Sequence, residues 1–85
     1  MGKTDNDQIK SIIGLEIKQL RNFLGLTQVE FGEKLNLDAA YISKIERGIK
    51  PISSIQLFTI LSVCNENDAI EFVVTIIDKI KSSNN

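Results

Sequence analysis

The sequence predicts an all-α fold of five short helices in a single domain spanning residues 1–85. Three observations support this fold class. Apolar residues recur at intervals of three and four, which is the period of one face of an α-helix. Residues that favour helix starts and helix ends separate these apolar stretches. With 42% hydrophobic and 25% charged residues, the chain has the composition of a globular protein.

An apolar stripe predicts the first helix. Its residues are spaced by four, four, three and four positions: Ile9, Ile13, Ile17, Leu20 and Leu24. Gly25 follows directly and ends this helix, because glycine readily adopts the left-handed conformation of a helix cap. The polar ends, residues 1–7 and 82–85, are expected to be loosely ordered.

The next two helices are separated by a short turn. Thr27 and Glu30 make a capping box that opens a helix over residues 28–35. After the turn of residues 36–38, a further helix is predicted over residues 39–47, with an aspartate at position 38 as its cap.

Small and apolar residues where these two helices meet indicate a helix-turn-helix over residues 28–47. Gly32 lies where the following helix would cross closely, Asn36 tolerates a left-handed turn, and Gly48 closes the second helix. The apolar residues between the helices would be Phe31, Leu35, Leu37, Ile42 and Ile45. A sharp turn, a small crossing residue and an apolar contact together describe this motif.

The C-terminal third predicts two more helices. A second capping-box pattern at Ser53 opens the fourth, and Asn67 or Asp68 opens the fifth, predicted over residues 68–82. Residues 69–77 are largely β-branched, so propensity alone would allow a strand. We predict a helix because five apolar residues fit its period: Ile70, Val73, Val74, Ile77 and Ile80.

The same five residues are the predicted interface of a homodimer. Apolar side chains cover more than one face of this helix, and a domain of 85 residues offers no second core to bury them. A lone Cys64 excludes an internal disulfide, which leaves association with a second copy as the natural way to stabilise so small a domain. The alternative is that this stripe packs only against the chain's own core.

Composition excludes most catalytic and metal chemistry. Without histidine there is no Ser-His or Cys-His pair, and one cysteine does not make a zinc site. We therefore expect no enzyme activity, no metal, no cofactor and no small-molecule ligand. No apolar run is long enough to span a membrane, and the N-terminal residues lack the apolar core of a secretory signal, so a cytoplasmic location is expected.

Charge is distributed unevenly although the net charge is only −1. Positions 39–64 contain three basic residues (Lys44, Arg47 and Lys50) and one acidic residue, Glu46. Every charged side chain from position 65 to position 78 is acidic. Any nucleic acid should therefore approach the middle of the chain, because the acidic C-terminal third repels phosphate.

The middle of the chain resembles the phage-repressor and Cro type of helix-turn-helix family, also called Xre-like. The resemblance extends from about Ile13 to Val63 and is strongest in the joint spacing of its motifs: Ile17, Leu20, Arg21, Gly25-Leu26-Thr27-Gln28, Phe31-Gly32, Leu35, Leu37, Tyr41-Ile42-Ser43, Ile45-Glu46-Arg47-Gly48 and Pro51. The run from Leu37 to Gly48 looks most like the small controller proteins of restriction–modification systems.

The resemblance implies a transcriptional regulator that binds double-stranded DNA, at a palindromic operator, as a homodimer. The third helix would enter the major groove and the second would cross the backbone. The residues implied to contact DNA are Gln28 at a phosphate, Ala39, Ala40, Tyr41, Ser43 and Lys44 on the face towards the bases, and Arg47 and Lys50 at the sugar-phosphate backbone. Arg21 and Glu46 are implied to form a structural ion pair, the alternative being that their charges act directly in function.

Several alternatives stay open in the sequence. Ala39 and Ala40 depart from the polar residues usual in the family and can only pack on thymine methyls, so base recognition would depend on Tyr41, Lys44 and DNA shape. Tyr41 could instead pack in the core, and Lys44 or Ser43 could simply face solvent. The alternative function is an antitoxin-like protein that neutralises a partner toxin, for which we would expect an extended tail beyond Ile80. A third possibility is a helical interaction module without DNA.

Overall fold

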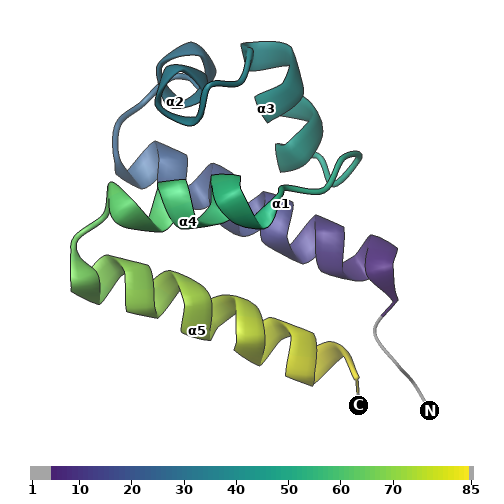
Figure 1. The fold of residues 1–85 in the computed structure, drawn as a ribbon. Coiled ribbons are helices and arrows are strands. Elements are labelled where there is room, and N and C mark those ends of the chain that lie inside the picture. Colours follow the sequence, from purple (N-terminus) through teal and green to yellow (C-terminus); the bar gives the residue numbers. More distant parts are fainter. Residues whose placement is uncertain (1–4, 85) are drawn as a thin grey trace.

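The computed structural model describes residues 5–84, and within that range the chain forms five α-helices and no strand (Figure 1). The all-α prediction is confirmed. None of these helices is both long enough and apolar enough to cross a membrane. The helices are α1 (Asn6–Phe23), α2 (Gln28–Leu35), α3 (Ala39–Glu46), α4 (Ser54–Ser62) and α5 (Glu66–Ser83).

All five helices contribute to one core. Helices α2 and α3 lie together at one end of the molecule, α5 lies at the opposite side, and α1 packs against both α3 and α5 (Figure 1). The buried apolar side chains are Ile17 and Leu20 of α1, Phe31 and Leu35 of α2, Ile42 and Ile45 of α3, Ile60 of α4, and Phe72 of α5. The core therefore fixes the position of α3 relative to α1.

The predicted caps account for most helix boundaries. The Thr27 hydroxyl accepts from the Glu30 amide at 3.1 Å, and the Glu30 carboxylate accepts from the Thr27 amide at 2.9 Å. Asn36 ends α2 in the left-handed conformation, with a φ of 57°, and Gly25 and Gly48 have φ values of 74° and 75°. The predicted bounds of α2 therefore agree with the structure, and α3 ends one residue earlier than predicted.

Two predicted boundaries are wrong by a few residues. Helix α1 begins at Asn6, because Asp5 and Gln8 form a capping box that the expectation of a loose N-terminal end overlooked. Helix α5 begins at Glu66 rather than at residue 68, because the Asn65 side chain, not Asn67 or Asp68, caps it by accepting from the Asp68 amide at 2.8 Å. Residues 1–4 and 85, at the predicted loose ends, lie outside the described part of the chain.

Residues 69–77 are helical, as predicted, but their apolar side chains divide between two surfaces. Phe72 is buried in the chain's own core, and Val73 packs against that core. Val73, one of the five residues predicted for the dimer interface, is therefore partly covered by the chain's own core. Ile70, Val74 and Ile77 are exposed, at 60%, 48% and 43% of their maximal accessible surface.

Candidate DNA-binding face

The turn between α2 and α3 depends on one glycine. The Leu37 amide donates to the Gly32 carbonyl at 2.8 Å, which folds the turn back onto α2. A Cβ atom on Gly32 would collide with the Leu37 carbonyl oxygen. The sequence predicted a close approach of α3 at Gly32. The tightest neighbour is the backbone of the turn, and the Ile42 side chain of α3 would lie 3.5 Å from the same Cβ.

Two further close backbone contacts hold the C-terminal end of α3 against α1. A Cβ atom on Gly14 would collide with the Ile45 carbonyl oxygen, and one on Gly48 would lie 2.7 Å from the Ser11 hydroxyl oxygen. Sequence reasoning missed Gly14. The sequence did contain a signal for this contact. A glycine inside a helix lowers helix stability, so a glycine in the middle of the apolar stripe of α1 indicates that close packing requires it.

A buried network connects α1, α2 and α3. The Arg21 guanidinium donates to both carboxylate oxygens of Glu46, through Nε at 2.6 Å and Nη2 at 3.1 Å, and through Nη1 to the Leu26 carbonyl at 2.9 Å. The Gln28 amide nitrogen donates to the same carboxylate at 3.1 Å. The pKa of Arg21 is raised, first because Glu46 accepts its hydrogen bonds and also because their charges attract, although burial opposes this. Arg21 therefore stays charged at every physiological pH.

The side chains of α3 range from buried to exposed around the helix. Ile42, Ile45 and Glu46 are buried and face α1 and α2. Of the residues predicted to face the bases, Ala40 and Lys44 are exposed. The other three, Ala39, Tyr41 and Ser43, are half-buried.

Tyr41 and Gln28, both predicted to contact DNA, have side-chain hydrogen bonds to residues outside their own helices. The Tyr41 hydroxyl donates to the Pro51 carbonyl at 3.5 Å, and its ring packs against the core. Gln28 is bound to Glu46, so its side-chain nitrogen points inward, although Gln28 lies in the first turn of α2, where helix amides point towards any bound anion.

The exposed cations at the end of α3 form a surface that we call the basic rim: Lys44, Arg47 and Lys50. Arg47 donates from Nε to the Ser43 carbonyl at 3.3 Å, which keeps its side chain along the helix. The one carboxylate within α3, Glu46, is buried and paired with Arg21. Glu46 therefore does not offset the positive charge of the rim, although the whole chain has a net charge of −1.

Residues 17–69 match the family described as Helix-turn-helix, which is more than half of the chain. The chain belongs to the helix-turn-helix family. Proteins of this class commonly bind DNA with the second helix of the motif in the major groove, and α3 is the helix that occupies this position in the chain. The matched segment contains the whole α2–turn–α3 unit and α4 but begins only in the middle of α1.

The proteins similar to this one include a viral regulator and a bacterial regulator of known structure. An uncharacterized HTH-type transcriptional regulator, R559, from Acanthamoeba polyphaga mimivirus is 53% identical over 36 residues, which span 42% of this chain and 16% of that protein. The crystal structure of the clp gene regulator ClgR from Corynebacterium glutamicum superimposes with a TM-score of 0.69 at 23% identity, over 86% of this chain and 77% of that one. The second similarity supports the fold.

Proposed function

We propose that this protein is a cytoplasmic transcriptional regulator that binds a palindromic DNA operator as a homodimer and catalyses no reaction. The observation that carries the proposal is the outer face of α3. It combines short side chains with the basic rim, and the Arg21–Glu46 ion pair holds the helix on its buried side. Short side chains such as Ala40 let a helix approach base edges closely, and cations beside them neutralise phosphates.

Within this face we assign two kinds of contact. Lys44 and Tyr41 would read base edges, with Ala39, Ala40 and Ser43 packing beside them. Arg47 and Lys50, at and beyond the C-terminal cap of α3, would contact phosphates together with the first turn of α2 at Gln28. Tyr41 would exchange its hydrogen bond to Pro51 for one to DNA.

The proposed binding is tested by a mobility-shift titration of the protein with the DNA upstream of its own gene over a salt series. Phosphate contacts release counterions, so affinity should fall steeply as salt rises. Arg47→Ala and Lys50→Ala should weaken operator and scrambled duplex equally and each lower the salt slope by about one. A wild-type protein that binds neither duplex at low salt would refute the proposal.

The proposed dimer interface is the outer face of α5. Ile70, Val74 and Ile77 follow one another at helical spacing and form an exposed apolar stripe, with Val73 and Ile80 half-buried beside it. Exposed apolar surface of this kind marks an interaction site, and a regulator of a palindrome needs a second copy related by a two-fold axis.

The chain offers a matched pair of variants to test this interface. Val74→Asp should give a monomer in sedimentation equilibrium and reduce operator binding, because a charge would be buried without a partner. Val29→Asp makes the same change at an exposed valine of α2, 57% accessible, and should leave the dimer intact. A wild type that sediments as a monomer at micromolar concentration would contradict the dimer.

Among regulators of this class, we propose the controller role in a restriction–modification system. Its support is the likeness of residues 37–48 to those small controller proteins. The corresponding test is binding to DNA upstream of a methyltransferase and endonuclease gene pair adjacent to this gene. The absence of such a pair would remove this narrower proposal and leave DNA binding unaffected.

A further inference from the structure

The N-terminal half of α1 lies beside the basic rim. The contacts of Gly14 with Ile45 and of Gly48 with Ser11 bring α1 directly against the end of α3 and the loop that follows it. Lys10, adjacent to Ser11, is thereby placed next to this loop. It lies outside the family match, which begins at residue 17.

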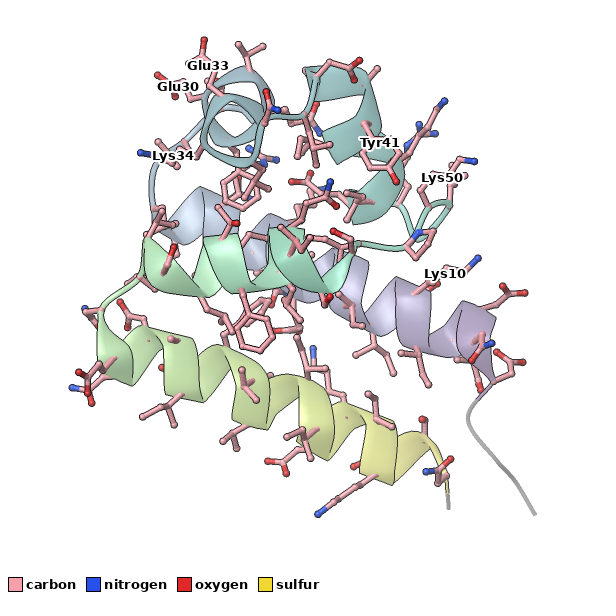
Figure 2. The ribbon with its side chains drawn as sticks, viewed as in Figure 1. Lys10, Glu30, Glu33, Lys34, Tyr41 and Lys50 are labelled. Atoms are coloured by element: carbon pink, nitrogen blue, oxygen red, sulfur yellow. The ribbon has the colours of Figure 1, made fainter. Side chains whose placement is uncertain are left out.

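Lys10 and Lys50 line the same surface cavity of about 390 Å³. The other side chains lining it are mostly apolar. They come from α1, from the end of α3 and from the loop after α3: Asn6, Ile9, Ile13, Ile45, Pro51 and Ile52. In Figure 2, Lys10, Lys50 and Tyr41 lie on one side of the molecule, whereas Lys34, Glu30 and Glu33 lie on the other. Lys10 therefore adds a fourth cation to the side that carries the basic rim.

The Lys10 side chain is partly covered by the protein. It is 29% accessible and lines the mostly apolar cavity, as is usual for a lysine whose aliphatic part packs on apolar surface. It forms an ion pair with Asp7 at 3.2 Å, and the Asp7 carboxylate is 90% exposed. A pair this exposed is weak, so a phosphate can replace the carboxylate at little cost.

We propose that Lys10 is a phosphate contact of the DNA-binding surface, which thus extends beyond the helix-turn-helix to the N-terminal turns of α1. The partner is the DNA backbone rather than the bases, since Lys10 lies outside the α2–turn–α3 unit and beside Lys50, whose proposed contact is also a phosphate. Asp7 acts as a weak intramolecular competitor for the same cation. The inference rests on the proposed DNA binding.

The test compares Lys10→Gln with Lys34→Gln, using a fluorescently labelled random-sequence duplex in a salt series. Each variant removes one positive charge, so any effect of net charge alone is shared. Lys34 belongs to α2 and lines a different surface with Glu30 and Glu33. Lys10→Gln should lower the slope of log affinity against log salt by about 0.9. The ratio of wild-type affinity to variant affinity should then shrink roughly three- to fourfold between about 50 and 200 mM salt.

Two further variants make the result decisive. Lys10→Arg keeps the charge and should keep the wild-type slope, and Asp7→Asn should tighten binding by roughly 1.5- to fivefold by releasing Lys10. If Lys10→Gln and Lys34→Gln are indistinguishable while Lys50→Ala lowers the slope, the role of Lys10 is refuted and the proposed function stands. If the wild type itself does not bind the duplex, the proposed function fails, and the role of Lys10 fails with it.

Discussion

Replacing Arg21 by alanine should destabilise the free protein, independently of DNA. The substitution removes both hydrogen bonds to Glu46 and the bond to the Leu26 carbonyl. The Glu46 side chain is only 3% accessible and would keep a single uncharged partner, Gln28. The carboxylate would then be buried without a counter-charge.

The expected magnitude follows from this burial. Breaking a buried pair by removing one partner costs about 3–5 kcal/mol. A domain of 85 residues has a total stability of roughly 4–13 kcal/mol, so the loss is a large part of it. The melting temperature should fall by at least about 12 °C, since each kcal/mol shifts a domain of this size by roughly 4–8 °C.

The assay is thermal unfolding followed by circular dichroism, with Lys18→Ala as the control on the exposed side of the same helix. The double variant Arg21→Met, Glu46→Leu should recover most of the lost stability, because it removes the unpaired charge itself. An Arg21→Ala protein that melts at the wild-type temperature would refute the structural role and leave Arg21 as a DNA contact or a bystander.

The remaining stability predictions concern the contacts of α1. Lys79→Ala should lower the melting temperature, because Glu16 is buried and the ion pair with Lys79 compensates its charge; a retained melting temperature would show that Glu16 needs no partner. Gly14→Ala should cost about 1–3 kcal/mol in urea unfolding, because its Cβ meets the Ile45 carbonyl. Gly25→Ala has no atom within 4 Å of its Cβ and should cost only about 1–2 kcal/mol from its left-handed backbone. A Gly14→Ala protein as stable as wild type, or more stable, as alanine makes an ordinary helix interior, would contradict the close contact.

All five helices and the caps of α2, α3 and α4 could be predicted because their signals are local. Thr27 and Glu30 are three residues apart, and Asn36 and Gly48 each act on their own turn. The start of α5 was misplaced because residues 65, 67 and 68 are all residue types that cap helices well. Only the folded structure decides at which of them the helix begins.

Contacts between distant segments could not be predicted from periodicity. The ion pair of Glu16 with Lys79 joins residues far apart in the chain, and neither position carries a motif. The division of α5 into a core side with Phe72 and an exposed side with Val74 depends on how the helix is rotated against α1. The Arg21–Glu46 contact was suggested only by the family resemblance, and its link to Gln28 was not anticipated.

The central claim is that the outer face of α3 reads DNA sequence, and one ratio tests it most directly. The affinity for the operator is divided by the affinity for a scrambled duplex at the same salt, for wild type, Lys44→Ala and Tyr41→Ala. A base contact is worth about 1–3 kcal/mol of discrimination, so each substitution should reduce the ratio at least fivefold and relax preference at one position. Unchanged ratios in both variants, with melting temperatures preserved, would contradict the assignment of α3 as the reading helix.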